Sequence, residues 1–309
     1  MSNKVSVIGT GNVGATCAQR VAQGDYADVV LLDIVNGMPQ GKAIDMMHSH
    51  PIVGSTSSII GTNKYEDTAG SDVVVITSGS TRKPGMDRRD LAFTNAEVIK
   101  SVVPQVLEHS PYCVMIMVTN PLDAMAYLAL KLSKLPKNRV MGMSGVLDTA
   151  RFRAIIAAEL DVSVEDVSAC ILGAHGDTMA PIPRLTTVGC VPITELLSKE
   201  KIDVLVDSSI HSGAEIVGLL KNGSAFYAPG VSAAQMAEAV VLDSKRILPV
   251  AAYLEGEFGL SGIYLGVPAK VGAGGVEQIL EFELTADEKA ALEKSAQSVR
   301  DLITDLDLS

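Results

Sequence analysis

The chain has 309 residues, which is long enough for two domains or for one large core that would normally divide. Its net charge is −11 at pH 7 and no Lys/Arg run of nucleic-acid type is present, so nucleic acids and anionic membranes are poor partners. No apolar run approaches the roughly 20 residues of a membrane helix, and Met1–Lys4 lead straight into a predicted strand without a signal peptide, so we expect a soluble, cytoplasmic protein.

The first half of the chain alternates short β-branched runs with amphipathic helical patterns. Strands that are apolar throughout and separated by helices are typical of a parallel sheet covered on both faces. The predicted strands are 5–8, 29–32, 57–60, 73–76, 112–118 and 139–141. The pattern therefore predicts a doubly wound α/β domain over residues 1–144.

From residue 145 the pattern changes to a mixed α+β arrangement with antiparallel hairpins. No Gly/Ser-rich or Pro-rich linker separates the halves, so we expect domains 1–144 and 145–309 to pack together around a cleft. A glycine cluster at 272–275 predicts a hairpin turn, and Thr285 with Glu288 forms a capping box before the last helix. The other predicted helices are 148–160, 201–220 and 232–246, and the predicted strands are 167–172, 183–188, 250–254, 263–267 and 278–282.

A glycine-rich loop connects the first predicted strand to a helical run at 15–22. In this G-x-G-x-x-G pattern the first glycine permits a tight turn, the second lets the backbone approach a pyrophosphate, and the third lets helix and strand pack closely. The helix N-terminus favours the negative charge. A purely structural turn is the alternative, but the strand–loop–helix context favours dinucleotide binding and a Rossmann domain. The loop residues are Gly9, Thr10, Gly11, Asn12, Val13 and Gly14.

Asp33 ends the second predicted strand, at the position where dinucleotide-binding domains carry an acidic residue. A carboxylate there accepts hydrogen bonds from the adenosine ribose hydroxyls and repels a 2′-phosphate, so it favours NAD over NADP. The alternative is an ordinary turn residue at the end of a strand.

Asp148, Arg151 and His175 are the candidate chemical groups. The first two share a D-x-x-R spacing at the start of a predicted helix, and the histidine stands in Gly-Ala-His-Gly-Asp. A carboxylate can orient an imidazole and stabilise its protonated form, while a guanidinium grips a carboxylate with two hydrogen bonds. Beside a dinucleotide site, the trio predicts acid/base chemistry on an organic acid.

Two polar loops follow predicted strands at their carboxyl ends, where doubly wound sheets bind ligands. Residues 79–90 are hinged by glycine and proline and carry Arg82, Arg88 and Arg89, which favours a lid that closes on an anionic substrate. A solvated charge patch is the alternative. The second loop carries Asn120, whose amide can bond both cofactor and substrate.

Together these motifs resemble the lactate/malate dehydrogenase family along essentially the whole chain, and its malate dehydrogenases in particular. Several independent motifs in the right order are more specific than any one of them. The segments that carry the resemblance are 9–14, 33, 82–88, 119–121, 145–151 and 173–177.

The resemblance implies a role for each matching residue. His175 would take the hydroxyl proton from malate as hydride leaves for the nicotinamide, and return it in the reverse reaction. Asp148 would orient the imidazole and stabilise the imidazolium. Arg151 would pair with the carboxylate next to the reacting carbon, and Arg88 would polarise the carbonyl. The implied cofactor contacts are Gly9, Thr10, Gly11, Asn12, Val13, Gly14, Asp33, Asn95, Val118, Thr119 and Asn120, of which Asn120 also contacts the substrate.

The resemblance implies that Arg82 determines which acid is the substrate. A cation at its position pairs with the second carboxylate of oxaloacetate or malate, whereas lactate dehydrogenases have a neutral residue there. Closing a lid on an unpaired arginine costs several kcal/mol, so pyruvate should be rejected. Arg88 rather than Arg89 is assigned to the substrate because its spacing from Arg82 matches the family. The segment His175–Asp177 favours a homotetramer over a dimer, and the activity implies a place in the tricarboxylic acid cycle.

The four cysteines, Cys17, Cys113, Cys170 and Cys190, lie far apart without C-x-x-C spacing. They are predicted to be buried reduced thiols rather than a disulfide or metal framework. No carboxylate or second histidine has a spacing that would complete a metal site with Cys170 and His175, so no metal is predicted. The remaining histidines, 48, 50, 109 and 211, are expected at the surface or at helix ends.

Three other functions compete with this interpretation. A lactate dehydrogenase or a broader 2-hydroxy-acid dehydrogenase is opposed by Arg82. An NAD- and metal-dependent glycosidase on the same fold would be considerably longer and would need a metal. A catalytically silent NAD-binding protein need not keep Asp148, Arg151 and His175.

Overall fold

The computed structural model describes residues 3–80, 88–221 and 223–308. The strands are β1 Lys4–Ile8, β2 Asp28–Leu32, β3 Ile59–Thr62, β4 Val73–Ile76, β5 Val114–Met117, β6 Val140–Gly142, β7 Val167–Ser168, β8 Ile171–Leu172, β9 Ala180–Pro181, β10 Thr187–Val188, β11 Val191–Pro192, β12 Arg246–Glu255, β13 Ser261–Gly272 and β14 Gly275–Ile279. The α-helices are α1 Asn12–Gln23, α2 Met38–Val53, α3 Arg88–His109, α4 Leu122–Ser133, α5 Gly145–Leu160, α6 Ile193–Leu196, α7 Lys199–Leu220, α8 Tyr227–Val241 and α9 Ala286–Asp305.

The main sheet of the described chain runs in the order β14-β13-β12-β6-β5-β4-β1-β2-β3. β1 to β6 pair in parallel, and every residue of β4 and β5 is buried. Continuous burial requires helices on both faces, which explains why these strands are apolar throughout. The predicted doubly wound α/β fold is confirmed.

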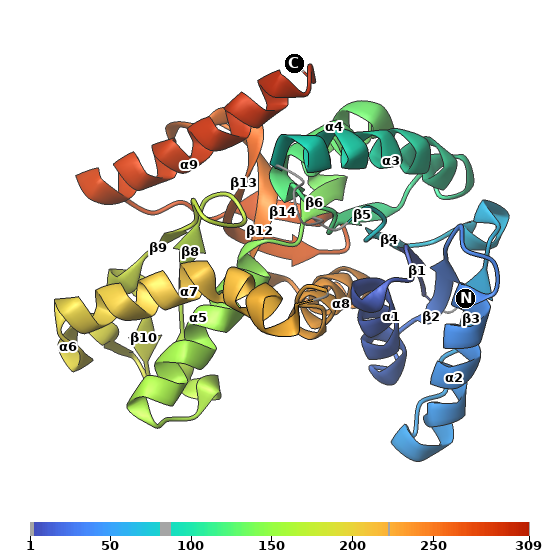
Figure 1. The fold of residues 1–309 in the computed structure, drawn as a ribbon, viewed down its shortest axis with the longest axis horizontal. Helices are drawn as coiled ribbons and strands as arrows, with labels where there is room; N and C mark the ends of the chain where they lie inside the picture. The colour runs from blue at the N-terminus through green and yellow to red at the C-terminus, as the bar shows by residue number, and fades with distance from the viewer. Residues whose placement is uncertain (1–2, 81–87, 222, 309) are drawn as a thin grey trace.

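Helices cover the two faces of the sheet with separate apolar clusters. α3 and α4 lie on one side, while α1 and α8 lie on the other (Figure 1). α8 belongs to the second half of the chain, yet it packs against α1 and against β4 and β5. The two halves therefore share a core across the sheet.

The second half also extends the sheet itself. β12 pairs antiparallel with β6 through Ala251 and Gly142, and β13 and β14 continue the antiparallel order outward. The predicted hairpin turn at 272–275 connects β13 to β14, and the capping box of Thr285 and Glu288 is formed at the start of α9. The expected antiparallel hairpins are thus present.

α5 and α7 enclose a third apolar cluster with the short strands β7 and β8, around Phe152 and Ile193. Three predicted elements of the second half differ from the observed ones. Residues 167–172 were expected to form one strand but form two, β7 and β8, which belong to different sheets. Residues 183–188 were expected to form one strand, but Pro183–Leu185 is a 3-10 helix because proline at its start favours a helical turn over a sheet ladder. α8 spans Tyr227–Val241 rather than 232–246, because Pro229 is tolerated in a first turn.

One burial prediction was wrong. Cys17 and Cys113 are buried and Cys170 is partly buried, but Cys190 is exposed in a turn where its φ is +73°. His50 lies in the last turn of α2, as expected of a helix-end residue, and only 6% of its surface is exposed. None of the described helices combines the length and the apolar character needed to span a membrane.

Candidate active site

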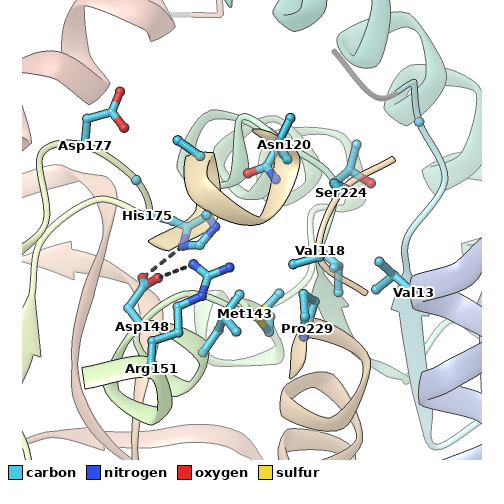
Figure 2. Close-up of a pocket in the computed structure, with 18 of the residues that line it drawn as sticks. Val13, Val118, Asn120, Met143, Asp148, Arg151, His175, Asp177, Ser224 and Pro229 are labelled. Carbon is cyan, nitrogen blue, oxygen red and sulfur yellow. Dashed lines mark hydrogen bonds and ion pairs between the residues drawn. The ribbon is translucent and has the colours of Figure 1, made fainter. Parts of the chain in front are cut away.

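His175, Asp148 and Arg151 are brought together as predicted. Asp148 and Arg151 lie on one face of α5 because their i,i+3 spacing is nearly one helical turn, and His175 follows β8. His175 Nδ1 lies 2.9 Å from Asp148 Oδ2, and Arg151 Nη1 lies 3.5 Å from Asp148 Oδ1. Figure 2 shows the imidazole and the guanidinium side by side, both joined to this carboxylate.

The surroundings of His175 favour its protonated form. Burial lowers the pKa of the imidazole, but the charge of Asp148, its hydrogen bond to Nδ1 and the charge of Asp123 together raise the pKa above its ordinary value. With Nδ1 held by Asp148, Nε2 is the ring atom left for exchange of a proton with a ligand.

Asp123 is a second carboxylate at His175 that the sequence did not reveal. Its Oδ2 accepts a hydrogen bond from the backbone N–H of His175 at 3.1 Å, and only 5% of its surface is exposed. Burial raises the pKa of this carboxyl group to about 6. Asp123 lies in the first turn of α4, where acidic residues are common because they stabilise the helix N-terminus. The sequence therefore contains no sign of its contact with His175.

Arg151 presents a mostly buried cation without a full set of partners. Its side chain is 16% exposed, and among the described residues its Nε has no hydrogen-bond partner. Burial lowers the pKa of the guanidinium, and only the charge of Asp148 opposes this effect. Because a buried guanidinium is stabilised by an anion, this arginine is suited to a ligand carboxylate.

A cavity of about 370 Å³ lies in front of these groups. Asp148, Arg151 and His175 line it at one end, and Val13 and Val118 line it towards the glycine loop (Figure 2). Charged groups and apolar side chains therefore line one cavity, as is usual for ligand sites.

The glycine loop has the geometry that a dinucleotide requires. Gly9 has a φ of +100°, and a Cβ on Gly14 would lie 1.9 Å from the Gly9 carbonyl oxygen, so neither tolerates a side chain. A Cβ on Gly11 would meet nothing within 4 Å. The loop is therefore closely packed at Gly9 and Gly14 and open at Gly11. This open position lies next to Asn12 and Val13 at the start of α1, and a helix N-terminus is a suitable site for a pyrophosphate.

Asp33 lies beside this loop at the end of β2. Its Oδ2 accepts hydrogen bonds from the Thr10 backbone N–H at 2.7 Å and from Thr10 Oγ1 at 3.0 Å, and its Oδ1 accepts one from Val35 N at 3.0 Å. Asp33, Gly9 and Gly11 line a cavity of about 830 Å³.

The two cavities meet at the carboxyl end of β4. Thr77, Gly79 and Ser80 line both, so the cavity at Asp33 and the cavity at His175 are neighbours along the edge of the sheet. β1 and β4 are the neighbouring strands at which the strand order reverses, the usual place for a ligand in such a sheet. A dinucleotide could therefore place one end at Asp33 and the other at His175.

The remaining predicted cofactor residues hold this edge together. Thr119 Oγ1 donates a hydrogen bond to Ser78 O at 2.6 Å. Asn95 is fully buried, and its amide accepts a hydrogen bond from Ser80 N at 2.7 Å and donates one to Asn120 O at 2.6 Å. Asn95 therefore links the loops after β4 and β5, and Asn120 lines the cavity at His175.

The arginines of the predicted lid are described only in part. Arg82 lies outside the described residues, and only the backbone of Arg88 is described, at the start of α3. Arg89 pairs with Asp305 of α9 at 3.2 Å. Within residues 3–80, 88–221 and 223–308, no group of three or more His, Cys, Asp or Glu side chains is placed to hold a metal ion.

Known proteins share both halves of this chain. The model of the lactate/malate dehydrogenase NAD binding domain matches residues 3–142, and that of the family's alpha/beta C-terminal domain matches residues 145–307. The malate dehydrogenase of Shouchella clausii is 55% identical over 98% of this chain and 97% of its own.

Solved structures agree with these matches. The malate dehydrogenase of Salinibacter ruber is 52% identical with a TM-score of 0.95, covering 98% of this chain and 97% of its own. The lactate dehydrogenase of Cryptosporidium parvum, solved with lactic acid and nicotinamide adenine dinucleotide, is 43% identical with a TM-score of 0.97, covering 100% of this chain and 99% of its own. With both domains matched in order and the site assembled between them, this chain belongs to the lactate/malate dehydrogenase family.

Proposed function

We propose that this chain is an NAD-dependent malate dehydrogenase, which converts (S)-malate and NAD reversibly into oxaloacetate and NADH. The proposal rests mainly on one observation: His175 and Arg151 both contact Asp148, in a cavity that Val13 of the glycine loop also lines. An acid/base group, a cation for a carboxylate and a dinucleotide site together match this reaction. The sequence similarity to malate dehydrogenases supports the same activity.

The residues divide the work between binding and proton transfer. Bound NAD supplies the hydride acceptor of the reaction. His175 Nε2 takes the hydroxyl proton of malate, and Asp148 stabilises the resulting imidazolium. Arg151 pairs with the carboxylate next to the reacting carbon, and Arg88 stabilises the charge that develops on the carbonyl oxygen of oxaloacetate. Asn120 hydrogen-bonds the ligand from the loop after β5.

The remaining cofactor roles follow the cavity lining. Asp33 receives the adenosine ribose, the loop Gly9–Gly14 receives the pyrophosphate, and Val13, Val118 and Thr119 flank the nicotinamide end. The Asp33 carboxylate would repel a 2′-phosphate, so NADPH should be a poor substitute for NADH.

The test of the activity is NADH oxidation by the purified protein in the presence of EDTA, with oxaloacetate, pyruvate and NADPH compared. We expect fast turnover only with oxaloacetate and NADH. Preference for pyruvate would assign the chain to the lactate dehydrogenases of the same family. Glycoside hydrolysis that requires NAD and an added metal, in place of this turnover, would indicate the glycosidase alternative. No turnover with intact NADH binding would indicate a silent relative.

Arg82 should determine the choice between the two acids. The expected effect of Arg82→Gln is a loss of about 10²-fold or more in kcat/KM for oxaloacetate, because the second carboxylate loses its partner. Activity with pyruvate should rise relative to oxaloacetate. Steady-state kinetics on both acids, with Arg89→Gln as the matched variant, tests this assignment. Unchanged relative activities in Arg82→Gln would remove the residue from the role.

Because His175 has a raised pKa, kcat/KM should depend on pH in opposite ways for oxaloacetate reduction and for malate oxidation. Oxaloacetate reduction needs the imidazolium, so its kcat/KM should fall as the pH rises through this pKa. Malate oxidation needs the neutral ring, so its kcat/KM should fall as the pH drops through the same pKa. Asp148→Asn removes a charge that raises the pKa, so both limbs should move to lower pH. Limbs that stay in place would show that another group titrates.

A homotetramer in the cytoplasm, acting in the tricarboxylic acid cycle, completes the proposal. The exposed apolar side chains of α2, among them Ile44 and Ile52, which are 56% and 85% exposed, support an interface with another copy. The segment His175–Asp177 supports four copies rather than two. The free cysteines are compatible with a reducing compartment.

A further inference from the structure

We propose that Lys42 is a positioning residue for the pyrophosphate of NAD, because its ammonium group holds the carbonyl of Thr10 and thereby orients the peptide that leads into α1. The inference rests on the proposed NAD-dependent function. Lys42 lies in α2, outside the glycine motif, and no sequence pattern singled it out.

The contact itself is short. Lys42 Nζ donates a hydrogen bond to Thr10 O at 2.6 Å, and Lys42 is partly buried. Met38, one turn earlier on the same helix, lines the cavity next to Asp33 and Gly11. Lys42 therefore reaches the loop from beside the cavity, and a hydrogen bond from a charged donor is stronger than one from a neutral donor.

Thr10 is held on both sides. Its backbone N–H and its hydroxyl bond to Asp33, and its carbonyl bonds to Lys42. The carbonyl and the N–H of a trans peptide point in opposite directions. Holding the Thr10 carbonyl against α2 therefore turns the N–H of Gly11 away from Lys42, at the point where the loop is open to a ligand.

α2, which carries Lys42, is fixed in place by hydrogen bonds and by close packing on β3. Gln40 Nε2 donates to Asn63 Oδ1 at 2.7 Å, and Asn63 Nδ2 donates to Asp33 O at 2.6 Å. A Cβ on Gly61 would lie 2.2 Å from Pro39 O, so the helix packs directly on the backbone of β3. The amine is thus attached to an element that is tied to Asp33. The net charge of the chain is −11, which repels a diphosphate, and the positive charge of Lys42 reduces this repulsion locally.

The experiment compares Lys42→Met with Lys4→Met. Lys4 makes the same kind of contact, from Nζ to Ala69 O at 2.8 Å, and begins β1, at the end of the strand opposite to the glycine loop. Binding of NADH, ADP-ribose and adenosine is measured by fluorescence titration and competition. For Lys42→Met we expect NADH and ADP-ribose to bind about tenfold more weakly, since both contain the pyrophosphate, and adenosine to change less than about twofold.

Two further readouts separate positioning from general structure. Lys42→Arg keeps the charge and the donor, so it should restore most of the affinity for ADP-ribose. In turnover, the loss in Lys42→Met should appear mainly in the KM for NADH and much less in kcat.

The inference fails if Lys42→Met and Lys4→Met bind NADH equally well. It also fails if adenosine is weakened as much as ADP-ribose, because α2 would then have only a structural role. A wild-type protein that does not bind NADH would refute the proposed function itself, which is a distinguishable result.

Discussion

Replacement of His175 by asparagine is expected to lower kcat for oxaloacetate reduction by about 10³-fold, the size of effect attributed to a positioned acid/base group. Asparagine can still bond to Asp148 but cannot donate and regain a proton at neutral pH. NADH binding should be retained, because the glycine loop and Asp33 are unchanged. Stopped-flow or steady-state NADH oxidation measures the first quantity, and fluorescence titration measures the second.

His211 offers a matched control for this variant. It lies on α7, its side chain is 63% exposed, and it pairs with Asp207. His211→Asn should therefore leave kcat nearly unchanged. If His175→Asn turned over oxaloacetate at a rate close to that of the His211 variant, His175 would not be the acid/base group.

Replacement of Arg151 should produce the second large loss. Removing one partner of a buried charged pair costs about 3–5 kcal/mol, so Arg151→Gln should lower kcat/KM for oxaloacetate by about 10²-fold to 10⁴-fold. Arg151→Lys keeps the charge but loses the planar two-bond grip on a carboxylate, so its loss should be smaller yet substantial. The effect should extend to pyruvate, because every 2-oxo acid carries the carboxylate next to the carbonyl.

Arg153 provides the control on the same helix. Its guanidinium donates to Val167 O at 2.6 Å and to Val164 O at 2.8 Å, away from the cavity. Arg153→Gln should lower the melting temperature while leaving the KM for oxaloacetate unchanged. Equal effects of the two substitutions on KM would contradict a direct role of Arg151 in binding the substrate.

Local sequence signals predicted most of the first half of the chain. β4 and β5 are buried on both faces, so each appears in the sequence as an uninterrupted apolar run, and β4 was predicted with its observed bounds. The short elements of the second half were less predictable. A two-residue strand such as β10 has no detectable period, and Pro183 initiates a helical turn inside an apolar stretch.

The site was predictable where its chemistry depends on residue type and local spacing. Asp148 and Arg151 share a helix face through their i,i+3 spacing, and the loop from Gly9 to Gly14 needs its glycines for steric reasons that the sequence displays. Asp123 and Lys42 were not predictable. Each acts through a backbone group far away in the sequence, and such a contact leaves no pattern in either segment.

The sequence by itself determined the parallel sheet, the glycine loop and the residue types of the trio Asp148, Arg151 and His175, because these follow from burial, sterics and spacing within short segments. The tertiary structure alone decided that α8 of the second half closes the face of the first half's sheet, and that β12 continues this sheet through Ala251 and Gly142. It also decided that Asp123 lies against the backbone of His175 and that Lys42 holds Thr10. These contacts join segments distant in sequence, and only the packing of the complete core brings them together.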